Sequence, residues 1–419
     1  MTTNETAMRN GPVRSADLVP NVRNGRGAGA FFAVVFSLCR LRRLCLAALC
    51  ALVAGLLFSR TSSGGEGQAA STPESSRGEA AAPSKDPPFY SDKLNLLCFR
   101  DEAGLDHPVR GAADWMKRRG HILAAMEQVM GTRPPLEFEG PPPVEVLEEI
   151  RTGNGVRRKI LYTVESPANR VPAYLFIPKS GGAKRPAMLC LHQTTPEGKA
   201  EMAGLRGRTN RQFGLEVAQR GYVTLVPDYP NFGDYRRDAY AAGYASATMQ
   251  GIVNHRRALD LLASMPEVDA RRIGVLGHSL GGHNALFLAV FDERVRVVVT
   301  SCGFNAFSKY YGGNLSGWSH DGYMPRIRSV YGCNPRKMPF DFTEVLAAIA
   351  PRPVFINAPL HDDNFEVSGV KDCVQAAAPV YRLLGAAEAL AAVYPDAEHD
   401  FPPEVRRQAY AWLDRQLGL

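Results

Sequence analysis

The sequence predicts an α/β protein whose sheet is mostly parallel, with helices on both faces. Two observations support this prediction. From Pro186 onward, short apolar runs alternate with segments of helical periodicity, which is typical of a parallel α/β sheet. At residues 277–281 a Gly-x-Ser-x-Gly pentapeptide stands between an apolar strand and an apolar helix, a context in which this motif marks a sharp strand-to-helix turn.

The positive charge of the chain is concentrated near its N-terminus. The 419 residues have a formal net charge of +7 and an isoelectric point near 9.0. Residues 1–60 contain eight arginines and two acidic residues, a net charge of +6, whereas the remaining residues carry +1. Because the body is nearly neutral, we expect no nucleic-acid partner. With 45% hydrophobic and 22% charged residues, the composition is that of an ordinary globular protein.

Residues 1–60 have the pattern of a leader. The uncharged run Leu44–Phe58 directly follows a cluster of arginines at positions 40, 42 and 43, as in a secretory signal. Its fifteen residues are fewer than the ~20 that a spanning helix needs, and an uncleaved anchor is the alternative. Residues 61–88 are rich in Ser, Gly, Ala and Pro and predict a flexible linker. We expect one folded domain over residues 89–419, exported to the periplasm or outside the cell, with membrane contact only through the leader.

The folded domain is expected to begin with a helix and an antiparallel unit. Residues 111–131 have apolar residues at helical spacing, and residues 144–177 contain three strand-like runs separated by turn residues. A further helix is predicted near residues 246–265. The expected parallel strands are Ala187–Leu191, Tyr222–Val226, Ile273–Leu276, Val295–Thr300, Val354–Asn357 and Leu390–Tyr394.

An aromatic segment at residues 303–342 interrupts this alternation. Nine of the 39 residues from Phe304 to Phe342 are aromatic, against 9% in the whole chain, and glycines are interspersed among them. Such an insertion favours a cap or pocket wall, with Trp318 and Tyr323 as candidate pocket residues. The alternative is that the rings only pack the insertion onto the body.

The pentapeptide Gly277–Gly281 places a candidate nucleophile, Ser279, at a strand-to-helix turn. Turning within one residue strains the backbone at Ser279 and presents its hydroxyl group above the sheet. Side chains at positions 277 and 281 would collide as strand and helix close together, which explains the glycines. A serine hydroxyl needs a general base, and the base needs an orienting carboxylate.

The base and the acid are expected on loops that follow later strands. His399 comes directly after the last predicted strand and is the candidate base. Asp362 and Asp363 follow the strand at residues 354–357; we favour Asp362 as the acid and keep Asp363 as the alternative, with Asp396 and Asp400 less favoured.

An oxyanion hole requires two backbone N–H groups. The amide of Leu280 follows from the turn. The second amide is expected in the loop after the strand at residues 187–191, from Gln193, with Thr194 next.

No metal or cofactor is expected. His361, Asp362 and Asp363 are adjacent in sequence, and the side chains of adjacent residues rarely point at one ion. The five cysteines after the leader are odd in number, widely spaced and without a C-x-x-C pair, so they form neither a disulfide framework nor a zinc site, although one disulfide could form.

The order Ser279, Asp362, His399 resembles that of the α/β-hydrolase superfamily. More narrowly, the chain is similar to the dienelactone hydrolase and acetyl xylan esterase-like branch over residues 114–419. The segments carrying this resemblance are Leu189–Leu205, Gly221–Tyr235, GHSLGGHNAL, Pro351–Glu366 and YPDAEHDFP. Dienelactone hydrolases usually have a cysteine nucleophile, so Ser279 argues against the dienelactone reaction.

The resemblance implies a serine carboxylic ester hydrolase with an acyl-enzyme intermediate. Export and the aromatic insertion favour acetylated or otherwise esterified carbohydrate as the substrate. The alternative is a serine peptidase of the prolyl-oligopeptidase type, although the segment from Phe89 to Pro186 is too short for the β-propeller of those enzymes. An inactive binding module is the third reading.

Overall fold

The computed structural model describes residues 86–132, 134, 140–179 and 182–419. The predicted leader and residues 61–85 of the predicted linker lie outside the described residues. In the part of the chain that is described, no helix combines the length and the apolar character needed to cross a membrane.

A short hairpin and a long helix precede the main sheet. Strands β1 (Cys98–Arg100) and β2 (Asp106–Pro108) pair antiparallel, an element that the sequence did not predict. Helix α2 (Ala112–Met130) confirms the helix expected over residues 111–131. Its buried stripe includes Trp115, Ile122 and Met126, which pack into the main hydrophobic core.

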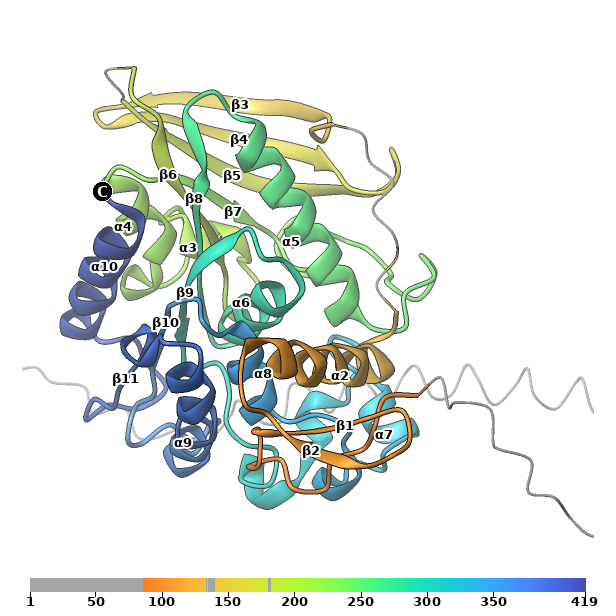
Figure 1. The fold of residues 1–419 in the computed structure, drawn as a ribbon. Helices are drawn as coiled ribbons and strands as arrows, with labels where there is room; N and C mark the ends of the chain where they lie inside the picture. The colour runs from red at the N-terminus through yellow and green to blue at the C-terminus, as the bar shows by residue number, and fades with distance from the viewer. Residues whose placement is uncertain (1–85, 133, 135–139, 180–181) are drawn as a thin grey trace, which may run out of the picture. The chain divides into compact units, whose positions relative to one another are not determined.

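Nine strands form the central sheet, in the order β11-β10-β9-β8-β6-β7-β5-β4-β3 (Figure 1). Its antiparallel end consists of β3 (Val144–Thr152), β4 (Gly155–Thr163) and β5 (Arg170–Pro178), which confirms the predicted antiparallel unit. The parallel strands are β6 (Arg185–Leu191), β7 (Val223–Pro227), β8 (Val268–His278), β9 (Val295–Ser301), β10 (Val354–Asn357) and β11 (Leu390–Val393). The mostly parallel sheet predicted from the sequence is therefore confirmed.

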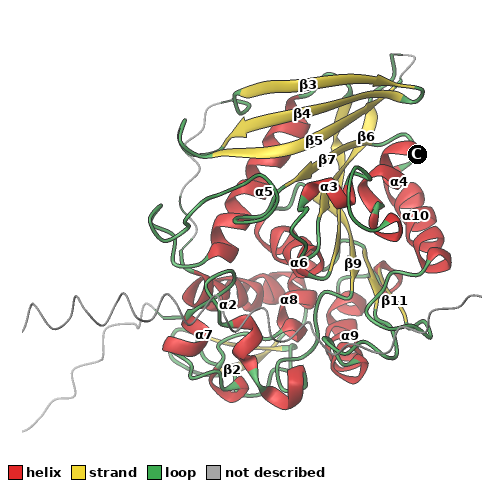
Figure 2. Ribbon diagram, turned by 180° about the vertical axis from the view of Figure 1, so that it is seen from behind, coloured by secondary structure: helices red, strands yellow, loops and turns green. Residues whose placement is uncertain are grey.

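Helices cover both faces of the sheet (Figure 2). One face is covered by α5 (Ala247–Ser264), α6 (Leu280–Phe291) and α9 (Val367–Leu383), and the other by α4 (Phe213–Gln219) and α10 (Pro403–Leu417). Helix α8 (Phe342–Ile349) packs on α6 and α9. Successive side chains of a strand point to opposite faces, so Val298 of β9 joins the first core and its neighbours Val297 and Val299 join the second.

The aromatic segment at residues 303–342 forms short helical turns: η2 (Tyr310–Gly313), η3 (Leu315–Trp318), α7 (Arg326–Ser329) and η4 (Pro335–Lys337). Five of its rings are buried: Phe304, Phe307, Trp318, Phe340 and Phe342. Phe307 contacts Trp318, Phe340 and Phe342 edge to face. Phe342 also stacks on Phe304 and on Phe287 of α6. Most of the segment's aromatic content therefore packs the insertion onto the body, which is the alternative that the sequence left open.

Candidate active site

The turn between β8 and α6 holds Ser279 in an uncommon backbone conformation. Its φ and ψ are 54° and −116°, a region that a non-glycine residue occupies only where the surroundings enforce it. A Cβ at Gly277 would lie 2.0 Å from the Gly281 carbonyl oxygen, and one at Gly281 would lie 1.9 Å from the Leu191 carbonyl oxygen. Both glycines are thus required for β8, α6 and β6 to approach this closely.

Ser279, His399 and Asp362 form one hydrogen-bonded row. His399 Nε2 lies 3.0 Å from Ser279 Oγ, and His399 Nδ1 lies 2.9 and 3.0 Å from the two carboxylate oxygens of Asp362. The Asp362 carboxylate is buried and accepts the backbone N–H groups of Asn364 and Phe365 at 2.9 and 3.0 Å. A carboxylate can only accept here, so His399 carries its proton on Nδ1 and presents a lone pair to Ser279.

These hydrogen bonds distinguish the two aspartates between which the sequence did not decide. Asp362, not Asp363, is the residue whose carboxylate contacts His399. Asp396, a less favoured candidate, pairs instead with His361 at 2.8 Å on the surface. The Oδ1 atom of Asp400 lies 2.9 Å from the Arg211 guanidinium.

The loop after β6 is fixed by a buried histidine. The N–H of Tyr229 donates to His192 Nε2 at 2.9 Å, so the proton on Nδ1 of His192 donates to the Gln193 carbonyl at 2.7 Å. The Gln193 side-chain amide donates to the buried carboxylate of Glu201. Gln193 is therefore held at both its backbone and its side chain. The Leu280 N–H begins α6 and has no intrahelical acceptor, because the first amides of a helix lack one.

A buried arginine ties the His399 loop to the end of β8. Arg211, at the end of the short helical turn η1 (Thr209–Arg211), donates to His278 Nε2 at 2.6 Å and to the His399 carbonyl at 3.0 Å. Because an arginine cannot accept, His278 carries its proton on Nδ1, which donates to Ser301 Oγ at 2.9 Å. Burial, with the Arg211 charge, holds the pKa of His278 well below its ordinary value.

The backbone carbonyl of Asp400, the residue after His399, also accepts a hydrogen bond from a buried side chain. The Asn357 side-chain amide donates to the Asp400 carbonyl at 2.9 Å and to Ser301 Oγ at 2.8 Å. The ends of β8, β9 and β10 thus converge on the loop that carries His399. As in other open α/β sheets, the site lies beyond the carboxyl ends of the parallel strands.

A cavity of about 600 Å³ opens onto Ser279 and His399. Gln193, Leu280 and Tyr323 are among the residues that line it. Trp318 is 2% exposed and lies behind the cavity, with its ring 5.8 Å from that of Tyr323 and 4.7 Å from that of His283. Trp318 therefore supports the wall rather than forming its surface. Its expected role was wrong because composition does not separate lining rings from packing rings.

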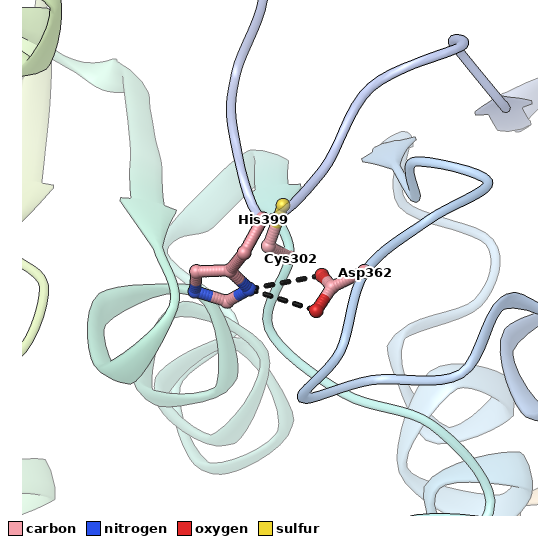
Figure 3. Close-up of side chains that lie close together, drawn as sticks. All are labelled: Cys302, Asp362 and His399. Atoms are coloured by element: carbon pink, nitrogen blue, oxygen red, sulfur yellow. Dashed lines mark hydrogen bonds and ion pairs between the residues drawn. The ribbon is translucent and has the colours of Figure 1, made fainter. Parts of the chain in front are cut away.

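Cys302 lies beside the His399–Asp362 pair (Figure 3). Ligand atoms of these three residues lie within 4.8 Å of one another, the one such group found in the described ranges. Burial, with the neighbouring Asp362 charge, raises the pKa of the Cys302 thiol well above its ordinary value, whereas a metal requires the thiolate. His399 Nδ1 is also already bonded to Asp362. These residues therefore fit the hydrogen-bonded row better than a metal ion. The five cysteines of the described part are free.

Arg211 was not predicted as a functional residue, and no role was predicted for His278 or His192. Arg211 lies 67 residues from His278 and 188 from His399 along the chain, and no local motif signals such contacts. The histidines stand at strand ends, which was a usable signal, but only the hydrogen bonds reveal that they hold neighbouring loops.

Comparison with known proteins places the chain among esterases. The model of the family "Glucuronyl esterase, fungi" matches residues 240–385, a segment that contains Ser279 and Asp362 and ends before His399. The putative hydrolase YtaP of Bacillus subtilis (strain 168) is 27% identical over 262 residues, which cover 59% of this chain and 84% of that protein.

Solved structures share the fold. A glucuronoyl esterase from Solibacter usitatus matches with a TM-score of 0.61 at 19% identity, covering 80% of this chain and 100% of the other. A putative acetyl xylan esterase from Bacteroides fragilis NCTC 9343 matches with a TM-score of 0.52 at 18% identity, covering 72% and 83%. With the sheet order and the Gly-x-Ser-x-Gly turn described above, these matches show an α/β-hydrolase fold, and the chain is similar to carboxylic ester hydrolases of the glucuronyl esterase and acetyl xylan esterase type.

Proposed function

We propose that the protein hydrolyses carboxylic esters by a two-step acyl transfer in which Ser279 is the nucleophile, His399 the general base and Asp362 the orienting acid. The observation that carries this proposal is the hydrogen-bonded row from Ser279 Oγ through His399 to Asp362, of which Ser279 and His399 line a cavity. Serine nucleophiles in this arrangement are activated by proton transfer to the histidine.

In the first step, Ser279 Oγ attacks the ester carbonyl carbon as its proton passes to His399 Nε2. The imidazolium is stabilised by the buried Asp362 carboxylate. His399 then returns the proton to the alcohol oxygen as the C–O bond breaks, which leaves an acyl-enzyme. A water molecule repeats the sequence, donating one proton to His399, and the carboxylic acid leaves with Ser279 restored.

We assign the stabilisation of the negative charge that develops on the carbonyl oxygen to the backbone N–H groups of Leu280 and Gln193, which would donate hydrogen bonds to it. Leu280 N–H lies at the positive end of α6, where a helix stabilises an anion. The hydrogen bonds that fix Gln193 support a donor whose position does not need to reorganise during the reaction.

The substrate class that we propose is an ester of a carbohydrate. The names of the matching family and structures, glucuronyl esterase and acetyl xylan esterase, support this class. The cavity supports it too, because polar and charged groups such as Thr194, Glu197 and Arg208 line it beside the rings of Tyr310 and Tyr323. Both signs of charge are present, so the cavity does not demand a charged ligand.

The test is an ester panel on purified protein that lacks residues 1–60: p-nitrophenyl acetate, p-nitrophenyl esters of longer acids, acetylated xylan and a methyl ester of glucuronic acid. We expect turnover of short acyl or uronoyl esters. A preference for long acyl chains would overturn the carbohydrate class. A panel of short peptides tests the peptidase alternative, for which cleavage after proline would be decisive. Failure to label Ser279 with a fluorophosphonate would favour an inactive binding module.

We also propose that residues 1–60 direct export to the periplasm or outside the cell, as a cleaved signal or an uncleaved anchor. The argument is the arginine-flanked apolar run Leu44–Phe58. Fractionation of cells that express the whole chain, with N-terminal sequencing of the product, tests this proposal. Recovery of full-length protein in the cytosol would contradict it.

A further inference from the structure

A second cavity lies directly beside the one that contains Ser279. Its volume is about 770 Å³, and Thr194 and Tyr323 line both cavities. Thr194 follows Gln193 in the loop to which we assign an oxyanion donor. The second cavity therefore adjoins the first at Thr194, the residue after the proposed oxyanion donor, and is also lined by residues of the loop after β7.

The walls of this second cavity are tied together by hydrogen bonds. The Tyr240 hydroxyl group donates to the Asp321 carbonyl at 2.7 Å, and the Tyr229 hydroxyl donates to the Gly322 carbonyl at 3.1 Å. These bonds join the loop after β7 to the segment 303–342. The space between the two segments is thus formed without a ligand, which is typical of small-molecule sites of about 300–1,000 Å³.

The lining combines aromatic faces with polar groups. Phe232 and Tyr240 contribute rings, and Tyr240 is 40% exposed. Arg236 lines the cavity and is exposed, and no acidic side chain of the described residues lies within ion-pair distance of it. The two charges next to it in sequence are already engaged, because Arg237 lies 3.7 Å from Glu165 and the Asp238 carboxylate accepts two backbone N–H groups. Arg236 is thus the charged donor available to a ligand.

We propose that the second cavity binds a further sugar unit of an extended carbohydrate ester whose scissile carbonyl lies at Ser279. The proposal rests on the proposed function. Apolar ring faces with hydrogen-bond donors at their edges suit a sugar, which has apolar C–H faces and an equatorial belt of hydroxyl groups. Two adjoining cavities of this size exceed what a simple acetate ester fills, so the second one contributes only when the substrate is longer than one sugar.

The kinetic test compares substrates of different length. Esterified xylo-oligosaccharides of one to four sugars, carrying whichever acetyl or uronoyl ester the wild type hydrolyses, are compared with the matching small ester. We expect kcat/KM to rise with length in the wild type. In Arg236→Ala, the loss should be about tenfold greater on the longest substrate than on the small ester, as expected for one hydrogen bond to a charged group. Arg336→Ala removes another exposed arginine, which lies outside the cavity, and should leave kcat/KM unchanged on both the longest substrate and the small ester. Equal losses on both substrates, or no length dependence in the wild type, would overturn the proposal.

A binding test separates this proposal from the proposed function. Unesterified xylotetraose is titrated calorimetrically into Ser279→Ala and into Ser279→Ala with Arg236→Ala. We expect the second protein to bind about tenfold more weakly, and identical affinities would overturn the subsite. If the wild type hydrolyses no carbohydrate ester while the Arg236-dependent binding persists, the proposed function fails and the subsite stands.

Discussion

The Arg211 guanidinium donates to Nε2 of His278 at 2.6 Å and to the backbone carbonyl of His399 at 3.0 Å. One side chain thus joins the residue that precedes the proposed nucleophile to the residue proposed as its base. The rings of His278 and His399 lie 5.1 Å apart. Because Arg211 occupies the lone pair of His278, the only imidazole of this pair that faces Ser279 with a free lone pair is that of His399.

Replacing Arg211 by methionine should lower kcat with little change in KM. The carbonyl of His399 would lose its donor, and a displacement of a catalytic group by about 1 Å can cost about 100-fold in rate. The Arg211→Lys variant keeps the charge but not the forked geometry, so it should restore only part of kcat. The measurement is steady-state kinetics on p-nitrophenyl acetate.

The Arg211 charge is one of the causes that lower the pKa of His278, so its removal in Arg211→Met should raise that pKa, while Arg211→Lys should keep it low. An NMR titration of the His278 ring distinguishes this effect from loss of folding. If Arg211→Met keeps both the kcat and the His278 titration of the wild type, Arg211 has no positioning role.

Asp362→Asn and Asp363→Asn form a matched pair. The first change removes the carboxylate that holds the Nδ1 tautomer of His399, and the equivalent change in serine proteases costs about four orders of magnitude in kcat. The second leaves the His399 contact in place, so kcat should stay within about threefold of the wild type, as for a substitution outside the row. The reverse ranking would assign the acid to Asp363.

Ser279→Ala should abolish acyl transfer while leaving the fold intact. By analogy with knockouts of serine protease triads, we expect a loss of about six orders of magnitude in kcat. Fluorophosphonate labelling should also disappear, and circular dichroism should be unchanged. Turnover near that of the wild type would show that another residue is the nucleophile.

The sequence located the elements of the parallel sheet well because its signals are local. Each predicted strand overlaps an observed one, and the strand at residues 354–357 matches β10 in both bounds. The order of strands is not a local property: β6 lies between β7 and β8, and only the tertiary contacts place it there.

The site was predictable where chemistry and spacing coincide, as at Ser279 and His399. The choice between Asp362 and Asp363 was not, because it depends on a turn in which Asp362 accepts the N–H groups of Asn364 and Phe365. Whether Trp318 lines the cavity or packs behind it depends on which rings of the segment reach the surface. Both are decided by packing between distant residues, which sequence periodicity does not encode.

Native-state alkylation should spare Cys302. Its thiol is buried, and its raised pKa keeps it protonated through neutral and mildly alkaline pH, whereas only the thiolate is alkylated. Among the five cysteines of residues 86–419, Cys98 and Cys333 are partly exposed and should react first with iodoacetamide at pH 8. Mass spectrometry of the modified peptides, with the unfolded protein as the control, measures the ranking. Rapid alkylation of Cys302 in the native protein would show that the loop carrying His399 opens.

Gly281→Ala should disrupt the turn that presents Ser279. The added Cβ would lie 1.9 Å from the backbone oxygen of Leu191, so α6 or β6 must shift, and such overpacking costs about 1–3 kcal/mol in the free energy of unfolding. Because the Leu191 end of β6 leads into the loop with Gln193, the shift should also lower kcat. Gly120→Ala in α2 is the matched control, since nothing lies within 4 Å of its added Cβ; there the better helix propensity of alanine should raise stability by about 0.5–1 kcal/mol. Urea unfolding of both variants, with kcat measured on the same samples, tests the pair, and a Gly281→Ala variant as stable and active as the wild type would refute the close approach of α6 to β6.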